Sequence, residues 1–204
     1  MWVRTTLFVV DGHWGEDTKS DLVLTAYHQD KAIPRAISLG TSTWRRATDD
    51  SLPARIKTSV NYLNGRLARI EGRTQGHEDM VLLNQNGRVA ESTGSAVIMV
   101  RNSVISTPPA TENALESLTV DICESLAEST GIPFVRRPVE RTELIVADEI
   151  ALCGTLCELA PVRRFERHDL QWESGLLVDL RNDYFDAVRG GVSHPDVHLT
   201  YLPD

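Results

Sequence analysis

The segment RIKTSVNYLN, residues 55–64, opens an amphipathic run with Lys57 and places an aromatic hydroxyl, that of Tyr62, five residues later. Apolar residues then recur at spacings of three and four: Val60, Leu63, Leu67 and Ile70. This spacing predicts a helix with one apolar face, which ends near the glycines at positions 72 and 76. A lysine alone is usually a solvated surface residue. The meaning of Lys57 therefore depends on residues that come later in the chain.

Two later segments carry residues that suit one kind of chemistry together with Lys57. The strand-like segment RVAESTGSAVIMV, residues 88–100, holds Glu91 among apolar residues, and such a strand seldom buries a carboxylate without a partner. The segment ADEIALCGTLCELAPV, residues 147–162, places a turn at Gly154 and Thr155. A lysine, a tyrosine, a glutamate and a Gly-Thr turn, in this order, are parts suited to pyridoxal phosphate (PLP).

The chemistry of PLP explains why these residue types are needed. A lysine amine adds to the cofactor aldehyde as a Schiff base and later moves the α-proton. A carboxylate opposite the pyridine nitrogen keeps that nitrogen protonated, so that the ring accepts electrons. A phenol can bind the ring oxygen, while hydroxyls and N–H groups at a helix start or tight turn can hold the phosphate. Tyr62 remains open to a second interpretation, as a core tyrosine whose hydroxyl reaches the surface.

Composition limits the other possibilities. The chain of 204 residues is 41% hydrophobic and 25% charged, with a formal net charge of −8, and its lysines and arginines are scattered. We therefore expect an ordinary globular protein that binds neither nucleic acid nor an anionic membrane. No apolar run approaches the roughly 18 residues of a membrane span, and the N-terminus lacks a signal-peptide pattern. Cys123, Cys153 and Cys157 lack the spacing of metal ligands, which predicts reduced thiols, no metal site and a cytoplasmic location.

Short strands and four helices are expected along the chain. The predicted strands cover residues 3–10, 21–27, 35–39, 80–83, 88–91, 96–100, 104–107, 134–139, 150–153 and 159–165, with a loop over 12–20. The predicted helices lie near residues 60–72, 118–131, 143–147 and 177–190. The Asn86-Gly87 pair is typical of a hairpin turn. This order predicts an α+β fold with a barrel-like sheet.

These motifs resemble those of the class IV, fold type IV PLP-dependent aminotransferases. The resemblance is closest to branched-chain amino acid aminotransferases, with D-amino acid aminotransferases and aminodeoxychorismate lyases as relatives, and runs from Val3 to the end of the chain. It is carried by VRTTLF (3–8), STWRR (42–46), KTSVNY (57–62), ESTG (91–94), ADE (147–149), CGT (153–155) and YFDAVRG (184–190). It implies a PLP-binding large domain over residues 46–204 with flanking helices, and a small-domain remnant over residues 1–45.

The resemblance also implies a role for each site residue. Lys57 would bind the cofactor covalently and transfer the proton. Tyr62 would contact the ring oxygen, and Glu91 the ring nitrogen. Three residues would hold the phosphate: Leu118, Thr119 and Thr155. The turn at Thr155 and Leu156 would also face the substrate carboxylate. For Thr119 a second interpretation stays open, that of an ordinary residue in the first turn of a helix.

The chain departs from the family pattern at the phosphate. Family members carry roughly ninety further residues before the matched strand, a small domain by ordinary domain sizes. That part supplies an arginine for the phosphate, and Arg46 and Arg55 are candidate substitutes here. The family's Pro-Gly-Ile-Thr-Arg appears as ESLTV, residues 116–120. Glu116 and the missing glycine should weaken anion binding. Ala96 replaces the asparagine that follows the family's glutamate strand.

We therefore expect a PLP-dependent aminotransferase-like enzyme with an unusually open site, acting on an amino acid and a 2-keto acid or a related amine through Lys57. Three alternatives remain. The first is a PLP-dependent lyase or condensation enzyme of specialised metabolism, and the second is a PLP-free binding or structural descendant of the fold. In the third, a second chain supplies the missing domain. We expect a homodimer, because apolar surface exposed by the loss of a domain must be covered.

Overall fold

The computed structural model describes residues 2–13, 15–28 and 32–201. The chain forms two compact units, Met1–Ile33 and Pro34–Asp204. The division expected after residue 45 therefore falls inside the second unit. The reason is that strand β3 (Ile37–Arg45) is hydrogen-bonded within the large sheet, between β4 (Asp79–Leu83) and β10 (Glu158–Phe165).

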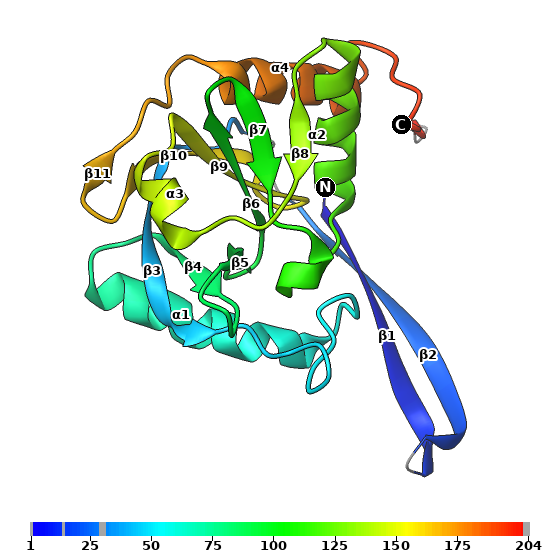
Figure 1. Cartoon of the computed structure of the whole chain (residues 1–204). Coiled ribbons are helices and arrows are strands. Elements are labelled where there is room, and N and C mark those ends of the chain that lie inside the picture. Colours follow the sequence, from blue (N-terminus) through cyan, green and yellow to red (C-terminus); the bar gives the residue numbers. More distant parts are fainter. Residues whose placement is uncertain (1, 14, 29–31, 202–204) are drawn as a thin grey trace. The chain divides into compact units, whose positions relative to one another are not determined.

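The first unit is an antiparallel ribbon of β1 (Trp2–His13) and β2 (Glu16–Tyr27), drawn in blue in Figure 1. Most of the expected loop over 12–20 belongs to the strands, because the polar residues from Glu16 onward continue the pairing. Side chains of directly paired residues share one face of a ribbon. One face consequently carries no charge between its ends: Val3, Thr5, Leu7, Val9, Ser20, Leu22, Leu24 and Ala26.

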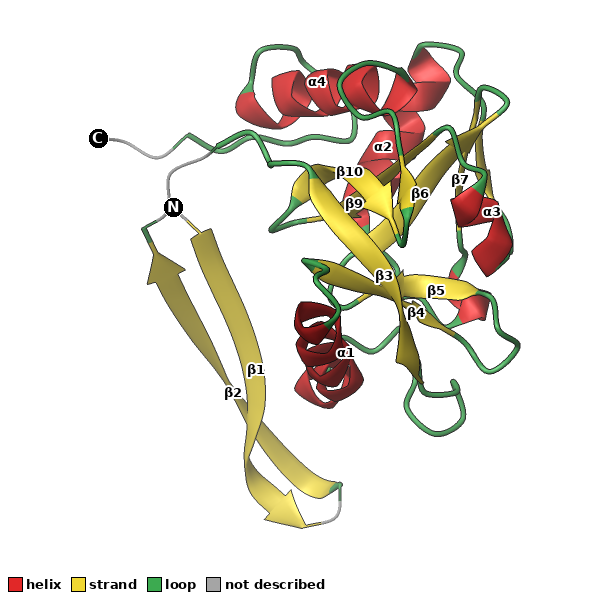
Figure 2. Ribbon diagram, turned by 90° about the vertical axis from the view of Figure 1, so that its left-hand side faces the viewer, coloured by secondary structure: helices red, strands yellow, loops and turns green. Residues whose placement is uncertain are grey.

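The second unit is built on one mixed, curled sheet (Figure 2). Its described strands run in the order β5-β4-β3-β10-β9-β6-β7-β8, with β11 (His168–Asp169) paired to β10. The remaining bounds are Val89–Ser92 for β5, Ala96–Arg101 for β6, Val104–Thr107 for β7, Phe134–Arg136 for β8 and Glu149–Gly154 for β9. The pairs β3–β4, β3–β10 and β7–β8 are parallel, and the other pairs are antiparallel. The α+β fold with a barrel-like sheet is confirmed.

Strand β6 separates two hydrophobic cores, which explains its uninterrupted apolar sequence. Ile98 and Val100 face the core that lies under α2 (Leu118–Ser129) and α4 (Leu176–Arg189). Val97 and Met99 face the other core, which also holds Leu144 of α3 (Arg141–Ile145). A strand buried on both faces has no need of polar alternation. The two helices α2 and α4 lie together on one side of the sheet in Figure 1.

Helix α1 (Tyr62–Thr74) follows the 3-10 turn η1 (Ser59–Asn61) and packs on β3 and β4. The predicted helix is confirmed, but its apolar stripe is not the face that meets the sheet. The buried residues are Gly65, Ala68 and Gly72, whereas Leu63 and Ile70 are each 59% exposed. A side chain at Gly65 would collide with the carbonyl group of Thr93. The close approach of the helix to the sheet thus requires small residues, and the larger apolar ones point outward.

Candidate functional site

Lys57 lies in the loop that joins β3 to η1, with its side chain exposed. Asn61 shapes this loop, because its amide nitrogen donates hydrogen bonds to the carbonyl oxygens of Pro53 and Ile56, each at 3.0 Å. These bonds fix the backbone on the N-terminal side of the lysine. The KTSVNY motif thus contains a positioning residue to which the sequence interpretation gave no role.

Glu91 lies on β5 with only 8% of its surface exposed. Its Oε1 atom is 3.1 Å from Nε of Arg46, and its Oε2 atom accepts a hydrogen bond from the backbone N–H of Leu115 at 3.1 Å. Burial raises the pKa of the Glu91 carboxyl, although Arg46, the Leu115 N–H and the charge of Lys57 act in the opposite direction. Among these influences, the charge of Lys57 is the smallest.

Arg46 connects the segments of the site. Its side chain is 9% exposed, and it donates to the carbonyl oxygens of Asn61 at 3.0 Å and Asn113 at 3.2 Å as well as pairing with Glu91. One guanidinium supports several such bonds because its donors lie in a fixed plane. These contacts occupy Arg46, so it does not serve as the substitute phosphate ligand considered above. The STWRR motif indicated the residue but not this role.

The start of α2 lies near Glu91, because Leu115 precedes that helix by only three residues. The hydroxyl of Ser117 caps the helix by accepting from the Val120 N–H at 3.4 Å. No acceptor is found for the N–H groups of Leu118 and Thr119 in the described part of the chain. Two donors at a helix N-terminus are thus available to an anion.

The hydroxyl of Thr119 is placed differently from its N–H group. Thr119 is 4% exposed, and its side chain interacts with the phenol of Tyr184. Burial raises the pKa of Tyr184 to about 12, while the Thr119 contact lowers it. This inward contact favours the interpretation of the Thr119 side chain as part of the first turn of the helix.

The Gly-Thr turn joins β9 to β10, with Gly154 paired to Glu158. Thr155 and Leu156 are exposed at its tip, Leu156 by 74%. The turn packs on the segment that follows Glu91, because the Cys157 sulfur lies 3.1 Å from the hydroxyl of Ser95. The turn and the glutamate strand therefore share one end of the sheet.

Arg189 of α4 fixes the far side of the same turn. It pairs with both carboxylate oxygens of Glu158, at 2.8 and 3.0 Å, and stacks over the ring of Phe185 at 3.9 Å. A two-oxygen pair of this kind restricts both side chains more than a single contact does. Glu158 has a positive φ of 51°, so this anchor also holds an unusual backbone conformation in place.

Tyr62 is the first residue of α1 and is partly buried. Its phenol has no hydrogen-bond partner among the residues that the structure describes. Because Tyr62 directly follows Asn61, the bonds that Asn61 makes to the lysine loop hold the start of the helix beside that loop. The start of α1, with Tyr62, is therefore tied to the loop that carries Lys57.

These residues fit the ring of PLP better than its phosphate. Each oxygen of Glu91 has one partner among the described residues, Arg46 for one and the Leu115 N–H for the other. A carboxylate offers about four acceptor positions, so a pyridine N–H can still be bound. At the phosphate end, Glu116 stands two residues before Leu118 and its side chain is 62% exposed. Within the described ranges, no cluster of His, Cys, Asp or Glu could hold a metal ion.

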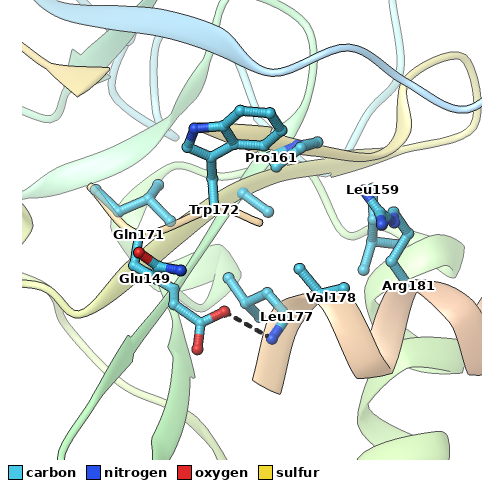
Figure 3. Close-up of a pocket in the computed structure, with 10 residues that line it drawn as sticks. Glu149, Leu159, Pro161, Gln171, Trp172, Leu177, Val178 and Arg181 are labelled. Carbon is cyan, nitrogen blue, oxygen red and sulfur yellow. Dashed lines mark hydrogen bonds between the residues drawn. The ribbon is translucent and has the colours of Figure 1, made fainter. Parts of the chain in front are cut away.

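The pocket in Figure 3 lies in another part of the unit. It is lined by residues of β9, β10 and α4 and includes Trp172 and Arg181 but neither Lys57 nor Glu91. Glu149 on its wall accepts hydrogen bonds from the N–H groups of Leu176 and Leu177 at 2.8 and 2.9 Å. Glu149 therefore caps the start of α4, which gives the glutamate of the ADE motif a structural role.

The family model for amino-transferase class IV matches residues 3–165. The chain belongs to the class IV aminotransferases. The resemblance to their branched-chain members is confirmed by a probable branched-chain-amino-acid aminotransferase of Synechocystis sp., 38% identical over 146 residues, which cover 72% of this chain and 48% of that protein. The branched-chain-amino-acid aminotransferase of Escherichia coli strain K12 is 31% identical over 171 residues, or 79% of this chain and 55% of the relative.

Solved structures agree with this class IV fold. Branched-chain amino acid aminotransferase from Thermobaculum terrenum in its PLP form superposes with a TM-score of 0.87 at 31% identity, covering 92% of this chain and 64% of the other. The branched-chain amino acid aminotransferase of Escherichia coli gives a TM-score of 0.84 at 25% identity, covering 96% of this chain and 66% of the other. The class IV chain thus spans between about half and two thirds of these relatives. None of its described helices is both long and apolar enough to cross a membrane.

Proposed function

We propose that this class IV chain is a PLP-dependent aminotransferase that acts on an amino acid and a 2-keto acid, with Lys57 as the residue that binds the cofactor. The observation that carries the proposal is the buried Glu91 carboxylate, paired with Arg46 and close enough to Lys57 to feel its charge. Burying an acid and its arginine partner costs desolvation free energy, so such a pair is weak evidence of a purely stabilising role. Binding a protonated pyridine nitrogen would explain why the buried carboxylate is retained.

PLP supplies an aldehyde that takes up amines and a ring that accepts electrons. The protein residues supply the rest. Lys57 would hold the cofactor through its amine, and Nζ would carry the α-proton of the substrate. Glu91 would bind the protonated pyridine nitrogen, and Arg46 holds the Glu91 carboxylate in place. Asn61 fixes the loop from which Lys57 extends.

The remaining groups of the proposed site would bind the cofactor phosphate, the ring oxygen and the substrate carboxylate. The N–H groups of Leu118 and Thr119 and the hydroxyl of Thr155 hold the phosphate. The phenol of Tyr62 binds the ring oxygen. The turn at Thr155 and Leu156, both of them exposed, would face the substrate carboxylate. Residues 1–45 would be the remnant of the small domain with the connecting segment, whose last strand, β3, pairs within the large sheet, and residues 46–204 would form the rest of the PLP-binding domain.

We also propose that a second copy of the chain covers the apolar stripe of α1. Val60 is 58% exposed, Leu63 and Ile70 59%, and Ile56 extends the stripe to the residue beside Lys57 with 60% exposure. Apolar stripes of this kind mark interaction surfaces. A second copy placed there would also exclude water from the lysine loop, which an open site needs. A separate chain that supplies the relatives' remaining part is the other candidate occupant.

A lyase or condensation reaction is the second candidate function. Leu118 is 80% exposed and Leu156 74% exposed, so both proposed binding elements face open solvent in the single chain. A bulky substrate could reach Lys57 without passing a cover. The three thiols are unpaired, which supports a cytoplasmic location for either reaction.

The proposal is tested by incubating the protein with PLP, an amino acid panel and 2-oxoglutarate, and by measuring glutamate release. Glutamate formation that is lost in Glu91→Gln and Lys57→Ala supports aminotransfer. Consumption of the amino acid without glutamate formation, equally dependent on Lys57, favours the lyase or condensation reaction. No dependence on PLP in any assay would exclude both reactions.

A further inference from the structure

An ion pair bridges the two ends of the proposed cofactor site. Nε of Arg55 lies 3.1 Å from Oε1 of Glu116. Arg55 comes two residues before Lys57, and Glu116 comes two residues before Leu118, whose N–H is free at the start of α2. The pair thus joins the lysine loop to the helix end proposed to hold the phosphate.

The bond between these two side chains is easily exchanged. Arg55 is 47% exposed and Glu116 is 62% exposed. Ion pairs this open to water stabilise a fold very little, because solvent screens both charges. A guanidinium binds phosphate through two parallel hydrogen bonds at least as well as it binds a carboxylate. An arriving phosphate can therefore replace Glu116 as the partner of Arg55.

Arg46, the other arginine near the proposed site, cannot exchange its partner for a phosphate in this way. Arg46 is buried and bound to Glu91 and to the carbonyl oxygens of Asn61 and Asn113. Removing it from Glu91 would leave a buried carboxylate without its counter-charge. Arg55, in contrast, leaves only an exposed carboxylate behind when it moves.

We propose that Arg55 binds the phosphate of PLP and that Glu116 holds Arg55 in an ion pair until PLP binds. This inference rests on the proposed function. Glu116 then acts in two ways against the cofactor, by holding Arg55 and by placing a like charge near the phosphate at the start of α2. This contact adjusts PLP affinity through the phosphate alone. The aldehyde and ring contacts are unaffected by it.

The proposal makes opposite predictions for the two halves of the pair. Glu116→Gln frees Arg55 and removes a negative charge, so PLP should bind several-fold more tightly. Arg55→Gln removes a charged hydrogen-bond donor from the phosphate, so PLP should bind about tenfold more weakly. In the double variant the loss should be smaller than in Arg55→Gln, because the repelling carboxylate is absent as well.

The test compares PLP with pyridoxal, which has the same aldehyde and ring but no phosphate. Dissociation constants for both are measured on the full chain from the visible absorption of the lysine-bound form, and borohydride trapping with peptide mass analysis verifies attachment at Lys57. The exposed ion pair of Arg164 and Asp169 provides matched controls, with Nε of Arg164 2.7 Å from Oδ1 of Asp169. Arg164→Gln and Asp169→Asn should leave both constants unchanged.

The expected result is a change in PLP affinity without a change in pyridoxal affinity, upward for Glu116→Gln and downward for Arg55→Gln. Equal changes for both ligands, or no change for either, with trapping at Lys57 intact, would overturn this inference and leave the proposed function standing. Absence of trapping at Lys57 with either ligand would overturn the proposed function and this inference with it. Thermal melts of each variant show whether a lost affinity comes from lost folding.

Discussion

Nε of Arg46 lies 3.1 Å from Oε1 of Glu91, and the two side chains are only 9% and 10% exposed. The residues stand 45 positions apart in the sequence and meet because β3 and β5 both flank β4. Each charge is tolerable in the interior only because of the other. The pair therefore sets both the stability of this region and the direction in which the Glu91 carboxylate points.

Replacing only one of these two residues should lower the stability of the protein. Arg46→Met leaves Glu91 buried without its counter-charge and should lower the free energy of unfolding by about 3–5 kcal/mol. The double variant Arg46→Met/Glu91→Gln should recover part of that loss. Urea denaturation of the single and double variants measures both values. Equal losses in Arg46→Met and in the double variant would contradict the coupling, and Arg164→Met is the exposed control that should show no measurable change.

The raised pKa of Glu91 predicts a pH dependence of stability. In the folded chain without cofactor the carboxyl keeps its proton above the ordinary value of 4.5, because burial is the largest influence on it. The folded state thus binds more protons than the unfolded state just above that pH, so Glu91 contributes stability at low pH that is lost as pH rises through its folded pKa.

The Glu91→Gln variant isolates this contribution. Other carboxyls, such as that of Glu143, have lowered pKa values and act in the opposite sense in both proteins. The unfolding free energy of the wild type minus that of Glu91→Gln should therefore fall as pH increases from about the ordinary carboxyl pKa upward. A difference that rises with pH would contradict the assignment.

Helix α1 offers a test of the close contact beside Glu91. A methyl group at Gly65 would meet the backbone carbonyl of Thr93, two residues after Glu91. At Gly72 it would meet only the flexible side chain of Met80. Gly65→Ala should therefore destabilise the protein by about 1–3 kcal/mol through overpacking. Gly72→Ala should cost less, because the side chain of Met80 can shift whereas the backbone carbonyl of Thr93 cannot. Equal melting shifts for the two variants would speak against this account.

The proposed interface between copies is tested on the outward face of the same helix. Leu63→Glu and Ile70→Glu place charges in the apolar stripe and should shift sedimentation toward the monomer. Val192→Glu alters a residue of equal exposure, 59%, outside the stripe and should leave association unchanged. A wild-type chain that sediments as a monomer at every concentration would exclude this use of α1.

Local patterns in the sequence predicted the elements but not all of their faces. Asn86-Gly87 correctly indicated the hairpin of β4 and β5, with Gly87 at a φ of +80°. The apolar spacing of α1 predicted the helix, but the contact at Gly65 turned its larger side chains outward. Periodicity detects a helix well, whereas the choice of face depends on how closely the sheet approaches, which no local pattern records.

The site was predictable to the extent that its motifs are local. The sequence motifs indicated Lys57 and Glu91 as site residues, and the charge of Lys57 contributes to lowering the pKa of the Glu91 carboxyl against the larger effect of burial. The contact of Arg46 with Glu91 and that of Arg55 with Glu116 join residues 45 and 61 positions apart. Such pairs depend on tertiary folding. The sequence interpretation consequently treated the two arginines as equivalent candidates, although only Arg55 is free to leave its partner.

The central claim is that Lys57 binds PLP, and the direct measurement is the absorbance spectrum of the purified protein with added PLP before and after borohydride. The prediction is a visible band that borohydride removes, with the cofactor then found on the peptide that contains Lys57. The Lys57→Ala variant should lack the band. The Lys19→Ala variant, which changes an exposed lysine of β2, should keep it. No band at saturating PLP, or a band that persists in Lys57→Ala, would contradict the claim.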